Sequence, residues 1–177
     1  DKNVVAKPSM NRADYFYAGS LLYAMGDYQG AVDNYTMMTH RTDSLGQIAN
    51  YQLGYSYIQV KNKVAAMDSF RDASRFEYSP DIQEDAWFNY AKLPFDLNHD
   101  TSPFFQYMDK YSSGKKGDII YSYMALAYLY NHDYAAAVEA YDKIDELTPD
   151  DFYPIGVYAL YHGIYAYRIE IIGRQLI

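Results

Sequence analysis

The residues that could carry chemistry are scattered along this chain. None of its histidines belongs to an H-E-x-x-H zinc motif, and neither a G-x-S-x-G nucleophile turn nor a phosphate-binding glycine pattern occurs. The histidines are His40, His99, His132 and His162. The pair His132-Asp133 could serve as base and acid, but an aspartate in a short turn is better placed to cap the next helix. Glu84 and Asp85 point about 100° apart on a helix and cannot easily share one substrate proton. We expect no catalytic residues, and therefore no enzyme.

Charge and cysteine content exclude several further classes of site. The 177 residues hold 15 Lys and Arg against 23 Asp and Glu, a formal charge of −8, which disfavours binding to nucleic acid. Cysteine is absent, so disulfides, thiolate nucleophiles and zinc–thiolate sites are excluded. No apolar run approaches the roughly 20 residues of a membrane span. We expect no cofactor, no metal and no membrane span.

Acidic residues concentrate between positions 133 and 151, with Lys143 as the single base. The acids are Asp133, Glu139, Asp142, Asp145, Glu146, Asp150 and Asp151. Their spacing does not fit a calcium-binding loop. A solvated helix face is the simplest interpretation, and docking of a basic partner is the alternative.

A pattern of small and aromatic residues recurs four times. Its clearest copies are GDYQGAVDNY at residues 26–35 and HDYAAAVEAY at residues 132–141. The copies begin near residues 12, 47, 84 and 118, and these starts differ by 35, 37 and 34 residues, close to the roughly 34-residue period of stacked helix pairs. Each pair cannot bury its apolar stripes alone, so neighbouring pairs should share one core. The sequence predicts an all-α solenoid of antiparallel helix pairs over residues 12–151.

Small residues and prolines predict details of these pairs. The small residues should mark the closest helix contacts, and they are Gly19, Gly54, Ala91 and Ala125 on first helices with Ala31, Ala66 and Ala137 on second helices. Pro94 should kink or end a first helix, because it removes a backbone donor. Pro103 should be the first residue of a short second helix that Ser102 caps. The turn Lys61-Asn62-Lys63 departs from the Gly-Asp-Tyr turn of the first copy.

The two ends of the sequence differ from the repeats. Residues 1–11 are expected to be a linker or the end of a preceding repeat. Residues 152–177 predict an additional helix that fits a truncated fifth repeat, apolar around much of its circumference. We therefore expect a segment of a larger protein, in which this last helix is covered by further chain or associates with another copy.

These repeats resemble the tetratricopeptide repeat family over residues 12–150. That resemblance implies a superhelix that binds other proteins rather than a particular partner. Members that grip acidic chaperone tails use lysines and asparagines where this chain has Ser20, Tyr55, Lys92 and Leu126, so such a clamp is not expected. The stretches AWFNYAKLPFDL (86–97) and FFQYMDKYSSGKKGDIIYSYMALAYLYNHDYAAAVEAYDKI (104–144) are similar in style to tetratricopeptide proteins of Bacteroides-type bacterial envelopes. This likeness implies a periplasmic or outer-membrane-associated scaffold, with a cytoplasmic location left open.

The first helices should present an aromatic, weakly charged face to the concave side of the superhelix. Aromatic side chains offer large contact area at modest entropy cost, so this face suits a partner protein or peptide. The candidate binding residues are Phe16, Tyr23, Tyr51, Tyr55, Phe88, Lys92, Leu126 and Tyr130. The chain holds 23 tyrosines, many of which would fill helix seams instead. Two alternatives stay open: a homo-oligomer formed through the C-terminal helix, with the groove idle, and the helical framework of a glycan-binding protein.

Overall fold

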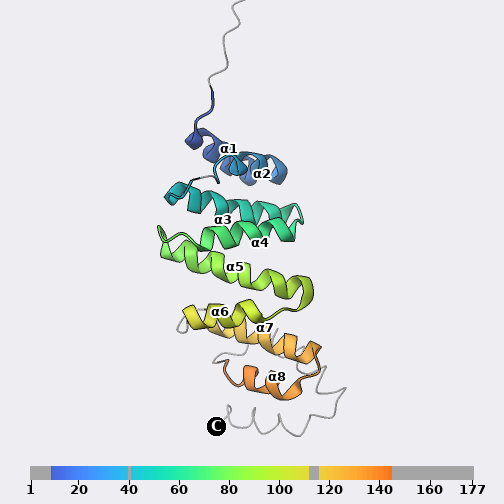
Figure 1. Ribbon diagram of the computed structural model, residues 1–177. Helices are drawn as coiled ribbons and strands as arrows, with labels where there is room; N and C mark the ends of the chain where they lie inside the picture. Colours follow the sequence, from blue (N-terminus) through green and yellow to red (C-terminus); the bar gives the residue numbers. More distant parts are fainter. Residues whose placement is uncertain (1–8, 40, 112–115, 145–177) are drawn as a thin grey trace, which may run out of the picture. The chain divides into compact units, whose positions relative to one another are not determined.

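The computed structural model describes residues 9–39, 41–111 and 116–144, and every regular element within them is an α-helix (Figure 1). The predicted all-α class is therefore confirmed. The chain divides into two compact units, Asp1–Pro103 and Phe104–Ile177. The predicted helix over 152–177 and most of the predicted linker lie outside the described residues. Within the described segments, no helix has both the length and the apolarity needed to cross a membrane.

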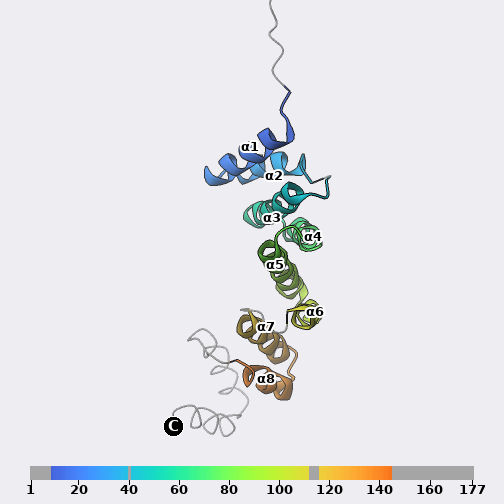
Figure 2. The ribbon, with the colours of Figure 1, turned by 90° about the vertical axis from the view of Figure 1, so that its left-hand side faces the viewer.

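The first unit contains five helices that follow one another in order, each packed on its predecessor (Figures 1 and 2). They are α1 (Arg12–Ala24), α2 (Tyr28–Thr36), α3 (Ser44–Gln59), α4 (Lys63–Ser74) and α5 (Pro80–Asn98). The second unit contains α7 (Gly117–Tyr130) and α8 (Tyr134–Tyr141), together with most of α6 (Ser102–Lys110), whose first turn spans the boundary.

Three helix pairs, α1–α2, α3–α4 and α7–α8, are joined by the same turn. One residue of each turn has a positive φ, and these residues are Gly26, Lys61 and His132. The next residue donates its backbone N–H to the carbonyl five positions earlier, and its side chain accepts the N–H three positions later; these residues are Asp27, Asn62 and Asp133. The expected capping role of Asp133 is confirmed. The Lys61-Asn62-Lys63 turn differs in sequence but not in geometry. Its N–H groups at Lys61 and Asn62 donate to the carbonyls of Ile58 and Tyr57, and the Asn62 side chain caps the next helix, as in the other two turns.

Small residues mark the closest helix contacts, as predicted. A Cβ atom added at Gly19 would lie 2.9 Å from the Tyr35 ring, and one added at Gly54 would lie 2.7 Å from the Phe70 ring. The alanines in the corresponding positions are all buried; they are Ala31, Ala66, Ala91, Ala125 and Ala137. A second helix can therefore approach the first until its aromatic ring touches the first helix's backbone.

Helix α3 takes part in two core clusters of the first unit. One cluster is formed by Ala31, Val32, Tyr35 and Leu53, and the other by Ala66, Phe70, Ala73, Ala86 and Leu93. Tyr57 of α3 packs against both clusters. Because α3 is shared in this way, α1 to α5 are held together by contacts that run from one helix pair to the next.

The structure bears on two predictions about prolines. Of the two outcomes predicted for Pro94, the end of the helix does not occur, since α5 continues to Asn98 and stops at His99, which has a φ of 60°. Helix α6 begins at Ser102, one residue earlier than predicted. Ser102 is not the cap, because its N–H and Oγ both donate to Asp100 Oδ1, at 2.9 and 2.6 Å.

Candidate partner-binding face

The predicted binding residues all lie on first helices of the pairs, but they belong to two units. Those of the first unit are Phe16 and Tyr23 on α1, Tyr51 and Tyr55 on α3, and Phe88 and Lys92 on α5. Leu126 and Tyr130 lie on α7 of the second unit, where Leu126 is half-buried and Tyr130 is 61% exposed. The candidate face is therefore described from α1, α3 and α5 alone.

Phe16 and Tyr23 contribute to helix packing. Both pack against the cluster that contains Tyr35, and the Phe16 ring lies 6.0 Å from the Tyr35 ring. Tyr23 meets Tyr28 of α2 edge-to-face at 5.2 Å. Both side chains are half-buried, so only part of each ring remains accessible to a partner.

A polar network ties Tyr51 and Tyr55 of α3 to α5. The hydroxyls of both tyrosines donate to the same carboxylate oxygen, Asp85 Oδ2, at 2.6 and 2.9 Å. Asn89 Nδ2 donates to that oxygen at 2.9 Å and to the Tyr55 hydroxyl at 3.1 Å. We call these four residues, Tyr51, Tyr55, Asp85 and Asn89, the tyrosine–aspartate network. All four residues are half-buried.

The tyrosine rings of this network also pack against Phe70 of α4. The Tyr55 ring meets Phe70 edge-to-face at 5.1 Å, and the Tyr51 ring meets Phe70 at 6.1 Å. The two tyrosines contact each other at 5.0 Å. Because the rings are packed on a buried phenylalanine and their hydroxyls are bonded to Asp85, neither side chain has much rotational freedom left to lose on binding a partner.

The network keeps its phenols protonated. Burial raises the pKa of Tyr51, and the hydrogen bond to Asp85 raises it further. Burial also raises the pKa of Tyr55, against the lowering effect of the hydrogen bond with Tyr51. Both hydroxyls therefore remain donors at neutral pH, and the site offers a hydrogen-bonded aromatic surface rather than an acid or base poised to react.

Sequence reasoning missed Asp85 and Asn89 as parts of this face. Each stands 34 residues after a network tyrosine, because Asp85 follows Tyr51 and Asn89 follows Tyr55 at that distance. This offset equals one repeat, so the signal was present in the spacing. The third pair was predicted to start at residue 84, 37 residues after the second. That register predicts Phe88 and Lys92 on the face instead, and both are half-buried on α5.

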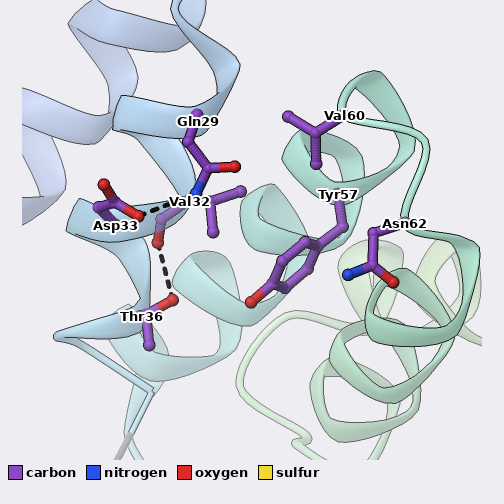
Figure 3. A pocket seen from close by; sticks show the side chains of 7 residues that line it. All are labelled: Gln29, Val32, Asp33, Thr36, Tyr57, Val60 and Asn62. Carbon is purple, nitrogen blue, oxygen red and sulfur yellow. Dashed lines mark hydrogen bonds between the residues drawn. The ribbon is translucent and has the colours of Figure 1, made fainter.

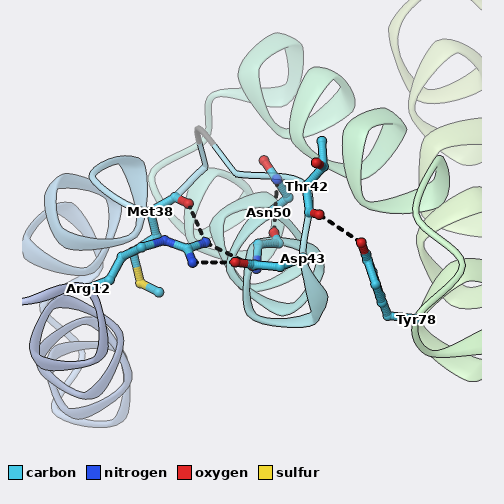
Figure 4. A network of polar contacts seen from close by, with 7 residues as sticks. Arg12, Met38, Thr42, Asp43, Asn50 and Tyr78 are labelled. Atoms are coloured by element: carbon cyan, nitrogen blue, oxygen red, sulfur yellow. Dashed lines mark hydrogen bonds and ion pairs between the residues drawn. The ribbon is translucent and has the colours of Figure 1, made fainter.

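A charged contact positions α1 against α3 (Figure 4). Arg12 donates to both carboxylate oxygens of Asp43, at 2.6 and 3.0 Å, and to the Met38 carbonyl at 3.1 Å. Asp43 is also the N-cap of α3 and accepts the Gly46 N–H at 2.7 Å. The hydrogen bond from Arg12, followed by that from Gly46, lowers the pKa of Asp43. Beside this contact, the Tyr78 hydroxyl donates to the Thr42 carbonyl at 2.7 Å. The α2–α3 loop is therefore hydrogen-bonded to Arg12 of α1 and to Tyr78, which precedes α5.

Replacing Asp43 by alanine should lower the free energy of unfolding by about 1–2 kcal/mol, because both the cap and the ion pair are lost. Asp43→Asn keeps an oxygen that can cap α3, so its free energy of unfolding should fall by less. Urea unfolding followed by circular dichroism measures both differences.

The Asp43 effect should also depend on pH. Since the folded pKa of Asp43 is lowered, its stabilising contribution is present above the unfolded value near 3.8 and disappears as the pH falls through the lower folded value. The stability difference between wild type and Asp43→Asn should therefore shrink in acid. A difference of the same size at pH 7 and at pH 2 would contradict this account.

The comparisons with known proteins give no assignment: neither a protein-family model nor a curated protein matches this sequence. In the described segments, no group of three or more histidine and carboxylate side chains is placed to hold a metal ion.

Proposed function

We propose that this chain is a tetratricopeptide solenoid with no catalytic activity, which binds a partner protein or peptide on the face formed by α1, α3 and α5. The recurring turn and the glycine–ring contacts support the repeat assignment, because they reproduce one helix-pair design at the predicted spacing. From the resemblance stated above, we further propose that it is a segment of a larger bacterial envelope protein.

The tyrosine–aspartate network is the observation that carries this proposal. Tyrosine is enriched at binding hot spots, since its ring supplies apolar area and its hydroxyl a directed polar contact. Here two tyrosines of one helix pair are fixed by an acid and an amide of the next pair. A partner segment lying across both pairs would meet an ordered surface, which lowers the entropy cost of binding.

The test starts from a random peptide library displayed on phage and selected on the complete chain. Isothermal titration then compares the selected peptides with wild type and with the double variant Tyr51→Phe, Tyr55→Phe. We expect about tenfold weaker binding by the variant. The rings stay, but the two hydroxyls that donate to Asp85 are lost, and with them the polar contacts that order this surface. Phenylalanine is preferred to alanine, since alanine would also remove the packing on Phe70.

Tyr17→Phe is the matched control, because Tyr17 lies on α1 and is 70% exposed. It should leave affinity unchanged, and circular dichroism should report the same helicity for all three proteins. Selected peptides that bind wild type and the double variant equally would place the binding surface elsewhere on the molecule.

A further inference from the structure

A pocket of about 560 Å³ lies between α2 and the end of α3 (Figure 3). Its lining residues are Gln29, Val32, Asp33 and Thr36 from α2, Tyr57 and Val60 from α3 and its C-cap, and Asn62 from the following turn. The pocket volume lies within the range of ligand sites.

This pocket is separate from the tyrosine–aspartate network. Tyr57 and Tyr55 are two positions apart on α3, so their side chains leave the helix about 200° apart. Tyr55 bonds to α5, whereas Tyr57 lines the pocket beside α2. A ligand of the pocket would therefore not compete with a partner on the α1, α3 and α5 face.

Several polar groups at the pocket have unused hydrogen-bonding capacity. The Tyr57 hydroxyl and the Asn62 amide nitrogen have no hydrogen-bond partner among the described residues, and Asn62 uses only its oxygen, as the cap for Ala65 N–H at 3.1 Å. The Gln29 amide nitrogen donates to Asp33 Oδ1 at 3.0 Å, which leaves the Gln29 oxygen and the other Asp33 oxygen without partners in the described part of the chain. Acceptors thus gather on the α2 side of the pocket.

The charge and shape of the lining favour one kind of ligand. Asp33 is the only charged residue that lines the pocket, and the whole chain carries a formal charge of −8. Val32, Val60 and the Tyr57 ring provide apolar surface between the polar groups (Figure 3). A ligand that matches this lining has an aliphatic stem and a planar cationic head, since such a head pairs with a carboxylate and stacks on an aromatic ring.

We propose that this pocket binds the guanidinium group of an arginine side chain that a partner protein inserts. The guanidinium pairs with Asp33 and lies over the Tyr57 ring, its remaining N–H groups donate to Gln29 Oε1, and its methylene stem contacts Val32 and Val60. The Asn62 amide donates to a backbone carbonyl of the inserted segment. An arginine is preferred to a lysine here because its planar head can make the carboxylate and ring contacts together.

The test is a titration of the ¹⁵N-labelled complete chain with Nα-acetyl-arginine N-methylamide, followed by NMR. Saturable shifts should appear at the amides of Asp33, Thr36, Tyr57 and Asn62. The citrulline analogue, which has the same shape without the charge, should bind about fivefold more weakly, since the ion pair is absent. Absence of saturable shifts at these amides, or equal affinity for both compounds, would overturn the proposal.

Asp33→Asn supplies the matching protein variant. Asp33 is exposed and asparagine can still accept the Gln29 hydrogen bond, so the fold should be unaffected. Affinity for the arginine compound should fall about fivefold.

Glu77→Gln changes the net charge equally at an exposed position outside the pocket and should leave affinity unchanged. An equal loss in both variants would reduce the effect to general charge attraction and refute a specific pocket. Tyr51→Phe, Tyr55→Phe should bind the compound like wild type, so this result is read independently of the proposed partner face.

Discussion

Gly54→Leu is expected to lower the free energy of unfolding by about 3 kcal/mol, an effect at the upper end for overpacking of a core. Even a single methyl at this position would lie 2.7 to 2.8 Å from three atoms of the Phe70 ring. Phe70 is itself 1% exposed and packed in the α4–α5 cluster, so it cannot move aside cheaply. Urea unfolding measured by circular dichroism gives the difference.

Two further variants test whether the Phe70 ring is the cause. Gly117→Ala is the control, because Gly117 is the first residue of α7 and nothing lies within 4 Å of the added methyl. It should leave stability unchanged or raise it. Gly54→Ala should cost less in a Phe70→Leu background than in the wild-type background, since the atoms that it meets are gone. Equal costs in both backgrounds would exclude the ring contact as the source.

Gln47→Ala is expected to lower the free energy of unfolding by about 3 kcal/mol, because several backbone groups of the α4–α5 connection form hydrogen bonds with this side chain. Gln47 is fully buried. Its amide nitrogen donates to the Phe76 carbonyl at 2.9 Å and to the Ser79 carbonyl at 3.3 Å, and its oxygen accepts the Ser79 N–H at 2.8 Å. Ser79 is the N-cap of α5 and makes no capping bond with its own side chain, so α5 is positioned through Gln47.

Gln47→Glu separates hydrogen bonding from cavity formation, since the two side chains have nearly the same shape. The introduced carboxylate can still accept from the Ser79 N–H, but it would face the carbonyl oxygens of Ala73, Phe76 and Ser79 without a proton to donate. Burial raises the pKa of such a carboxyl, so the variant should approach wild-type stability in acid and lose it as the pH rises above about 4. A stability loss that does not change with pH would show that the amide donor is unimportant.

Local patterns predicted much of the helical framework correctly. The contacts at Gly19 and Gly54, the buried alanines and the cap at Asp133 follow from residue types at fixed offsets within one helix pair. Such features depend on neighbours close in sequence, where helix geometry already fixes which residues face each other. The helix end at Pro94 and the cap at Ser102, by contrast, were wrong predictions. Helix α5 continues past Pro94, and the carboxylate of Asp100 accepts the Ser102 N–H at the start of α6; the proline rules alone predict neither feature.

The candidate site was only half predictable. The outward positions of Tyr51 and Tyr55 on a first helix indicate a binding face, and their role in binding a partner remains a prediction. Asp85 and Asn89 were overlooked, because a small error in the third repeat's register changes which α5 residues face α3. The pairing of Arg12 with Asp43 joins residues 31 apart, and Gln47 reaches residues 26 to 32 positions away. Contacts at these separations require knowledge of which helix faces meet.

The sequence by itself determined that this chain forms helix pairs of nearly constant length, because periodic apolar residues, small residues and turn caps act within about 34 residues. It also excluded thiol chemistry through the absence of cysteine. Only the tertiary structure decided which polar side chains meet across neighbouring helix pairs. The network on Asp85, the Gln47 bonds to the α5 cap and the pocket around Asp33 and Tyr57 all arise from the register of one helix against the next. That register is set by the packing of rings against glycine and alanine, which brings together residues that no local spacing rule connects.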